Sequence, residues 1–376
     1  MKILFVVSWY SAYGLPVHEG IFHYEQALAL KRFTDVDVAI YFPFDTSIQD
    51  DFSDEIEYGV RVFRRRSKKN KYVRYLGYIN DYKRIKKDYN PDIIHAHVAG
   101  AAGMVTFFWK LFFCRPYILT EHAPIELMHL GKIKHYLLHK VIYKNSQKRI
   151  CVSNDLREKL EKYYPKQNFD VIYNGVFSPT EQIVVENDWI EKKHKINCAI
   201  VAAFYDKEIK GYQYLLPAIK ELSKSGIDIC LHICGGGKYL DYYKNLAAEL
   251  EISERCVFYG QISKSMVYTI VSQMNFVLSA SLFESAGVSV EEAMLLGKPL
   301  VVTCSGGASS LVTKETAIVV DKGSSEALVS GIKDMINQYD KFDSIVIKNY
   351  ATDNFDIESV SIKYLNLYKE VCCERS

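Results

Sequence analysis

The sequence lacks a hydrophobic run long enough to cross a bilayer. Its longest apolar stretch, residues 98–113, is interrupted by Lys110 and is shorter than the roughly 20 residues that a membrane-spanning helix needs. The early segment KILFVV is too short for the apolar core of a secretory signal peptide, and no cleavage site follows it. It therefore predicts a first β-strand. From these absences we expect a soluble, cytoplasmic protein.

Paired cysteine spacing, internal repeats and low-complexity tracts are also absent. The nine cysteines are an odd number without regular spacing, which is typical of reduced thiols in a cytosolic protein. Cys230 and Cys234 flank His232 in an apparent strand, but a metal site would need further ligands nearby. We expect buried thiols at these positions and no metal site in the protein.

The length and the charge distribution indicate two domains and an acidic partner. A chain of 376 residues exceeds what one hydrophobic core usually serves. Residues 1–175 hold 27 Lys and Arg against 19 Asp and Glu, a balance of +8; the remainder holds 20 against 26, a balance of −6, and the sum is the net +2 of the chain. A basic front half favours an anionic membrane surface or a diphosphate-bearing acceptor as partner. An ordinary solvated surface is the alternative.

One stretch, residues 279–299, combines an apolar strand, a short helix and two acids. An apolar run at 276–278 precedes it, and residues 288–296 have the spacing of a short helix. Gly297 and the proline two residues later are typical of a helix end. A new β-branched strand is predicted at 300–303.

The two acids suit an extended ligand. Glu284 precedes the helix and Glu292 lies inside it, and eight helical residues rise about 12 Å. Between them, the helix N-terminus beside Gly287 offers free N–H groups to a phosphate. A nucleotide-sugar has this layout of ribose diol, diphosphate and sugar diol. The alternative is an amphipathic helix with solvated acids.

The same stretch resembles the E-x7-E signature of the retaining glycosyltransferases of family 4, the group 1 glycosyltransferases. The resemblance is carried by Ser281, Glu284, Ser285, Gly287, Glu292, Ala293, Met294, Gly297, Lys298 and Pro299. It implies a GT-B fold, a nucleotide-sugar donor and transfer with retention, without a divalent metal. It also implies that Glu284 holds the sugar hydroxyls and Glu292 the ribose. Glu291 should not share the ligand, because adjacent helical residues point about 100° apart.

Further segments resemble the family along most of the chain. In the first half, GIFHYEQALAL after Gly20 resembles the loop and helix that lie against the donor phosphates, and PDIIHAH resembles a family strand. His122, at the predicted carboxyl end of a strand, matches the histidine that faces the transferred sugar and the acceptor. Parallel sheets bind ligands at that edge. A structural histidine is the alternative.

In the second half, Lys210 matches the family's phosphate-neutralising lysine, while Phe204 stands where the family usually has an arginine. The turn at Gly235 resembles the one near the base-binding crevice. The resemblance thus implies His122, Glu284 and Lys210 as catalytic residues. Its donor-binding residues are Gly20, Lys210, Gly235, Glu284, Gly287, Val288 and Glu292.

An acidic stretch at 45–57, which we expect to be a loop, precedes a basic segment in the first half. The basic segment predicts an anionic partner. Its members are Arg61, Arg64, Arg65, Arg66, Lys68, Lys69, Lys71 and Arg74. Anionic lipid, a lipid-diphosphate sugar and nucleic acid could each use it. No nucleic-acid module accompanies it, so nucleic acid ranks last. The resemblance places the segment in the acceptor-side domain, which favours peripheral contact with the inner face of the cytoplasmic membrane.

We therefore expect a GT-B α/β protein with two Rossmann-like, doubly wound parallel-sheet domains facing across a cleft. Its parts should be an acceptor-side domain at 1–177, a donor-binding domain at 196–355, and a helix at 356–376 that crosses back. The expected function is retaining, metal-independent transfer of a sugar from a UDP- or GDP-linked donor to a glycan or lipid-linked acceptor in surface polysaccharide synthesis, without a cofactor. The alternatives are a non-catalytic nucleotide-sugar-binding partner of another transferase and a sugar-nucleotide 2-epimerase or phosphorylase of this fold.

Overall fold

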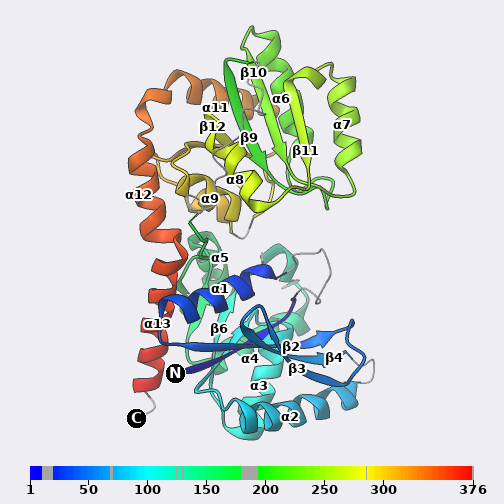
Figure 1. The fold of residues 1–376 in the computed structure, drawn as a ribbon, viewed down its shortest axis with the longest axis vertical. Helices are drawn as coiled ribbons and strands as arrows, with labels where there is room; N and C mark the ends of the chain where they lie inside the picture. Colours follow the sequence, from blue (N-terminus) through cyan, green and yellow to red (C-terminus); the bar gives the residue numbers. More distant parts are fainter. Residues whose placement is uncertain are drawn as a thin grey trace. The chain divides into compact units, whose positions relative to one another are not determined.

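The computed structural model describes residues 1–10, 20–67, 71–123, 125–128, 131–178, 194–284 and 286–374 (Figure 1). The chain forms two compact units. Met1–Gly175 and Ile357–Ser376 make up the N-terminal unit, and Val176–Asp356 make up the C-terminal unit. The linker expected at 177–195 lies largely outside the described residues. Each unit is a layered α/β structure around its own sheet.

The N-terminal unit contains an eight-stranded sheet with the order β3-β4-β2-β1-β5-β6-β7-β8. All neighbouring strands are parallel except β3 and β4, which are antiparallel. The apolar run near the N-terminus forms the central strand β1 and is buried after its first residue. The strands are β1 Lys2–Val7, β2 Asp37–Asp45, β3 Phe52–Glu57, β4 Val60–Arg66, β5 Ile93–His97, β6 Tyr117–Glu121, β7 Arg149–Cys151 and β8 Asp170–Val171.

Helices cover both faces of this sheet, and the last helix of the chain is one of them. α13 packs against α1 (Figure 1). Its apolar residues, among them Val360, Tyr364 and Tyr368, are buried in the same core as the strands. The helices are α1 Ile21–Phe33, α2 Lys71–Asp88, α3 Ala101–Phe113, α4 Ile133–Asn145, α5 Asn154–Tyr163 and α13 Ile357–Cys373, with a 3-10 turn η1 at Ile125–Met128.

The C-terminal unit has a parallel six-stranded sheet with the order β11-β10-β9-β12-β13-β14. Its strands are β9 Ile196–Val201, β10 Ile229–Cys234, β11 Cys256–Gly260, β12 Phe276–Ser279, β13 Leu300–Thr303 and β14 Ala317–Val320. Its helices are α6 Tyr212–Lys224, α7 Leu240–Glu249, α8 Lys264–Ser272, α9 Val288–Leu295, α10 Gly307–Ser310, α11 Ser325–Asn337 and α12 Ser344–Phe355, with 3-10 turns η3 Ser253–Arg255 and η4 Tyr339–Lys341. The strand order reverses between β9 and β12, and ligands of open α/β sheets bind beyond the carboxyl ends of strands at such a point.

The structure overturns the prediction for the acidic stretch of the first half and removes part of the basis of the prediction for the basic segment. The acid-rich segment 45–57, expected as a loop, contains strand β3. Its acids pair with the basic strand β4 beside it, because Arg64 forms ion pairs with Asp45 at 2.5 Å and with Glu57 at 2.8 Å. Arg65 pairs with Asp81 of α2, and all of these side chains are buried.

The basic segment is therefore not a continuous patch for an anionic surface. Arg64 and Arg65 are occupied inside the fold, and Arg61 pairs with Asp54 at 2.6 Å. Lys68 and Lys69 lie outside the described residues. Successive side chains of a strand point to opposite faces of the sheet. The run of basic residues in the sequence therefore does not form one continuous basic surface.

The thiols behave as expected, since all nine cysteines are free. His232, between Cys230 and Cys234, is buried and uses both ring nitrogens in hydrogen bonds, at 2.8 Å to Tyr259 and 3.1 Å to Asn197. Its role is therefore structural. Within the described parts of the chain, no helix is both long enough and apolar enough to cross a membrane.

Candidate functional site

The first candidate residue, Lys210, is held by a glycine turn that follows β9. Gly211 has a φ of +72°, and a Cβ at this position would lie 1.9 Å from the carbonyl oxygen of Ala280. The amide of Leu282 donates to the carbonyl of Ile209 at 2.7 Å. Only glycine allows so close a backbone approach at positive φ. The turn is thus locked against the carboxyl end of β12.

This contact brings the predicted lysine and the first predicted glutamate together. The ammonium of Lys210 donates to the Glu284 carboxylate at 2.8 Å, and the hydroxyl of Ser281 donates to the same oxygen at 3.4 Å. The side chains of Lys210 and Glu284 are 29% and 25% exposed, so a ligand can reach both. A cation beside a carboxylate at the switch point can neutralise a phosphate and accept hydrogen bonds from sugar hydroxyls.

Helix α9 begins immediately after this group. Gly287 is its N-cap residue, and a Cβ there would lie 3.0 Å from both Cα and Cβ of Ala308, so a larger residue would displace the helix start. Val288, the first helical residue, is 41% exposed. The first N–H groups of a helix have no acceptor within the helix and sit at its positive end. This end of α9 is suited to an anion.

The second predicted glutamate lies inside α9 in its own surroundings. The hydroxyl of Tyr268 donates to Glu292 at 2.8 Å, and the ammonium of Lys264 lies 3.3 Å from the same oxygen. The Glu292 side chain is 12% exposed. It is thus oriented by α8 and less accessible than Glu284.

Glu291, one residue earlier, has the opposite environment. Its side chain is fully buried, and neither carboxylate oxygen has a hydrogen-bond partner among the described residues. Burial, together with the nearby charge of Glu292, raises the pKa of this carboxyl well above its ordinary value. Glu291 is therefore neither a ligand of the site nor a solvated acid.

The glycine turn after β10 packs against the turn after β9. A Cβ at Gly235 would lie 2.1 Å from the carbonyl oxygen of Ala202, and the amide of Phe204 donates to the carbonyl of Gly236 at 2.9 Å. The Phe204 ring is buried and stacks on Tyr212 with the ring centres 4.3 Å apart. The position where the family resemblance places an arginine thus holds a core aromatic residue.

In the N-terminal unit, Gly20 and His122 lie at the corresponding sheet edge, near the reversal of strand order between β1 and β5. Gly20 is the N-cap of α1 with a φ of +74°, and a Cβ there would lie 2.6 Å from the carbonyl oxygen of Trp9. His122 follows β6 directly, and the ring of Phe22 in the first turn of α1 lies 4.9 Å from its ring. The start of α1 therefore borders His122.

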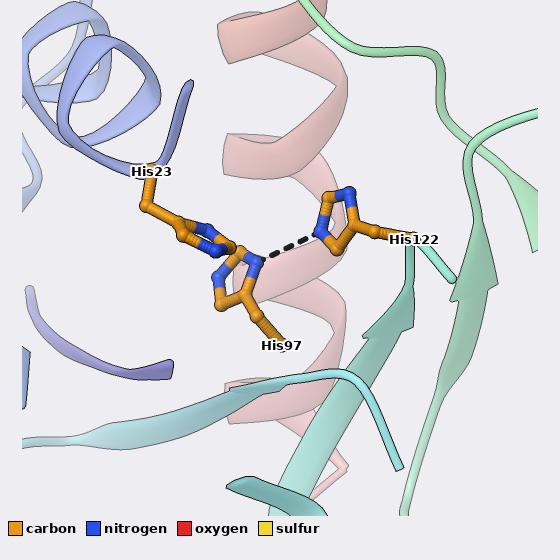
Figure 2. A group of neighbouring side chains, drawn as sticks. All are labelled: His23, His97 and His122. Carbon is orange, nitrogen blue, oxygen red and sulfur yellow. Dashed lines mark hydrogen bonds between the residues drawn. The ribbon is translucent and has the colours of Figure 1, made fainter. Parts of the chain in front are cut away.

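His122 belongs to a cluster of buried imidazoles (Figure 2). Nε2 of His122 lies 3.0 Å from Nδ1 of His97 in a hydrogen bond, and the ring of His23 lies 4.6 Å from that of His97. Burial lowers the pKa of His122 to about 3, although a hydrogen bond that the imidazole donates to the side chain of Asn174 opposes the shift. Burial also lowers the pKa of His23 and of His97 well below the ordinary value. All three rings are therefore neutral at physiological pH.

Motif reading missed several members of these groups. His23 and His97 stood inside recognised segments without a role, and the contacts of Ser281 with Glu284 and of Tyr268 and Lys264 with Glu292 were not predicted. The alternation in His95–Ala96–His97 indicates that both histidines share one face of β5. Which neighbour they meet depends on the register, in which His97 pairs with Thr120 of β6. A single sequence does not contain that register.

Comparison with known families identifies the chain. A family model described as "Glycosyl transferases group 1" matches residues 186–352, and one described as "Glycosyltransferase Family 4" matches residues 22–177. The chain belongs to the group 1 glycosyltransferases of family 4. The family predicted from the E-x7-E stretch is confirmed.

Relatives found by sequence agree with this family, and solved structures agree with its fold. An uncharacterized glycosyltransferase of Methanocaldococcus jannaschii is 28% identical over 342 residues, which cover 90% of this chain and 89% of the relative. Alpha-monoglucosyldiacylglycerol synthase of Streptococcus pneumoniae is 25% identical over 58% of this chain and 53% of that protein. The structure is similar to Anabaena HepE in complex with UDP, with a TM-score of 0.78, 18% identity and coverage of 98% and 100% of the two chains. HepE with UDP-glucose is matched at a TM-score of 0.73, 18% identity and the same coverage. The predicted GT-B fold is confirmed.

Proposed function

We propose that this glycosyltransferase moves a sugar with retention from a nucleotide-sugar donor to a glycan or lipid-linked acceptor, without a divalent metal or a cofactor. The observation that carries the proposal is the Lys210–Glu284 pair, held 2.8 Å apart at the switch point of the C-terminal sheet. In this assignment Lys210 neutralises the donor diphosphate, Glu284 accepts hydrogen bonds from the sugar, and Glu292 holds the ribose.

The chemistry follows from the charge that develops as the donor breaks. The bond between the sugar carbon and the diphosphate oxygen breaks while the acceptor oxygen bonds to the same carbon from the same face. A diphosphate oxygen then accepts the acceptor's proton. Within the C-terminal unit, the positive groups suited to stabilise the leaving diphosphate are the Lys210 ammonium and the N-terminus of α9 at Gly287. His122 is the candidate contact to the transferred sugar.

A UDP-linked hexose is the first donor to test, and a GDP-linked sugar the second. The similar protein HepE is described in complex with UDP and with UDP-glucose. For the acceptor, the relative named alpha-monoglucosyldiacylglycerol synthase suggests a lipid-linked class. Surface glycan synthesis at the cytoplasmic face of a membrane is the setting that suits both.

We place the contact with anionic lipid on α4 rather than on the basic segment 61–74. Ile133, Leu137 and Val141 recur at every fourth position of this helix and are 70%, 49% and 42% exposed. The exposed lysines beside them are Lys134, Lys140 and Lys144. Residues 127–154 contain six Lys or Arg and no acid. An apolar stripe flanked by lysines complements an anionic bilayer surface.

Co-sedimentation with vesicles tests this surface. Reversing the three exposed lysines of α4 (Lys134→Glu, Lys140→Glu, Lys144→Glu) should release the protein from anionic vesicles. The matched control reverses three exposed lysines of α2 (Lys83→Glu, Lys86→Glu, Lys87→Glu), which should leave binding nearly unchanged. Equal binding by both triple variants would remove the membrane contact from the proposal.

The activity test measures release of nucleoside diphosphate from a panel of UDP- and GDP-sugars in EDTA, with and without membrane extract as acceptor. Lys210→Ala, Glu284→Ala and Glu292→Ala should each lower turnover on the order of 100-fold, as removal of a preorganised charged group does. Glu291→Gln is the matched control and should retain activity. NMR of the product reports whether the anomeric configuration is retained.

Two outcomes would contradict the proposal. Equal losses at Glu291 and Glu292 would show that the ligand-facing register of α9 is wrong. Binding of a donor without release, even with acceptor present, would favour a non-catalytic nucleotide-sugar-binding partner of another transferase. The buried Phe204, in place of a phosphate-binding arginine, is the observation that favours this second function.

A further inference from the structure

Three imidazoles from separate elements converge in the N-terminal unit. His23 comes from α1, His97 from the end of β5 and His122 from the residue after β6 (Figure 2). Their nitrogen atoms lie within 4.8 Å of one another, and all three side chains are buried. The cluster therefore offers three nitrogen ligands in one enclosed place.

The hydrogen bonding of this cluster is incomplete. Both ring nitrogens of His23 and Nε2 of His97 are buried and have no hydrogen-bond partner in the described part of the chain. A neutral imidazole carries one N–H and one lone pair, and an unsatisfied buried polar group costs about 1–3 kcal/mol. Such nitrogens call for a ligand that the described residues do not supply.

Two other buried histidines show what a purely structural imidazole looks like in this protein. His95 uses both nitrogens, at 2.8 Å to the hydroxyl of Tyr368 and 2.8 Å to that of Thr120. His232 does the same with Tyr259 and Asn197. His23 differs from both, because neither of its nitrogens has a hydrogen-bond partner among the residues that the structure describes.

We propose that His23, His97 and His122 form a site for a divalent transition-metal ion of the zinc class. Neutral imidazole favours zinc, cobalt, nickel and copper over magnesium or calcium, which prefer oxygen ligands. Metal–nitrogen bonds of about 2.0–2.1 Å in a tetrahedral site require nitrogens about 3.3 Å apart. The 3.0 Å between Nδ1 of His97 and Nε2 of His122 is near this value. A nitrogen of His23 lies within 4.8 Å of a nitrogen of each of the other two rings. Three protein ligands leave one position for water.

The site has a consequence for transfer, which rests on the proposed function. An ion on His122 occupies the ring that the proposal places against the transferred sugar. Micromolar zinc should therefore inhibit transfer rather than support it, and EDTA should reverse the inhibition. This agrees with a reaction that needs no metal at the diphosphate.

The test is direct binding, which does not depend on activity. The full chain, without an affinity tag and with its accessible thiols alkylated so that they cannot bind metal, is stripped with EDTA and titrated with Co²⁺ and Zn²⁺. Visible d–d bands of tetrahedral cobalt and a calorimetric stoichiometry of about one are expected for three nitrogens and a water. His23→Phe and His97→Asn should each weaken binding at least about 100-fold, more than the loss of an outer-shell partner does.

The matched control is His139→Asn. His139 is a buried histidine of α4 outside the cluster, and one of its nitrogens is also unpartnered in the described residues. Its replacement should leave the titration unchanged. Circular dichroism verifies that each variant is folded, and two cluster variants are used so that one folding failure does not end the test. The same isotherm for wild type and either folded cluster variant would overturn the proposal, as would an octahedral cobalt spectrum.

Discussion

Replacing Glu291 with glutamine should stabilise the C-terminal unit, and the gain should increase with pH. Glu291 is fully buried in α9 and has no hydrogen-bond partner among the described residues. Burial, with a smaller contribution from the charge of Glu292, raises the pKa of its carboxyl well above the ordinary 4.5. In the unfolded chain the same group ionises near that ordinary value.

The magnitude follows from proton linkage. Between the unfolded and the folded pKa, the folded state holds one proton more than the unfolded state. The free energy of unfolding of the wild type therefore falls by about 1.4 kcal/mol for each pH unit in this window. Glutamine does not titrate, so the Glu291→Gln variant does not lose stability in this way as the pH rises. The advantage of Glu291→Gln should thus be smallest near pH 4.5 and widen through neutrality until the folded pKa is reached.

The assay is urea denaturation followed by circular dichroism at about pH 5, 6, 7 and 8, with both proteins compared at each pH. Glu249→Gln, at an exposed position of α7, is the control and should show a nearly constant difference from wild type. A constant difference for Glu291→Gln would refute the reasoning, because it would mean that Glu291 is ionised and paired in the folded state.

Two further predictions concern buried side chains. Phe204→Arg should destabilise the C-terminal unit by more than about 3 kcal/mol and should not raise activity, because the new charge enters the stack with Tyr212. Phe204→Leu is the control and should keep both the fold and the transfer activity. Enhanced turnover by a folded Phe204→Arg variant would contradict this prediction. Asp81→Asn should cost about 3–5 kcal/mol in urea denaturation, since it leaves Arg65 buried without its charge partner. Asp54→Asn removes one partner of the partly exposed pair with Arg61 and should cost less than about 1 kcal/mol of unfolding free energy. Similar losses of stability in Asp81→Asn and Asp54→Asn would show that burial does not decide the strength of these ion pairs.

The order of elements around the E-x7-E stretch was predictable because each is set by local chemistry. The sequence shows the apolar run of β12, the helical spacing of α9 and the glycine that ends this helix. In the structure that glycine, Gly297, has a φ of +70°. The close approach at Gly211 was not predictable. The motif showed a glycine after Lys210, but only the fold shows the carbonyl of Ala280 that excludes a side chain.

The failures share one physical cause, which is that a side chain's environment depends on partners distant in sequence. Arg64 and Arg65 read as surface charge, yet Asp45, Glu57 and Asp81 neutralise them inside the fold. The absence of an arginine at Phe204 was visible in the sequence, but only the fold shows that Phe204 is a core residue.

The sequence by itself determined the family, the two α/β units and the candidate site residues Lys210, Glu284 and Glu292, because strand and helix periodicity and motif spacing are local properties of the chain. Only the tertiary structure decided that Lys210 pairs with Glu284, that Glu291 is buried while Glu292 is held by Tyr268, and that His23 meets His97 and His122. Those relations arise from strand order and register, which bring residues far apart in the chain within bonding distance.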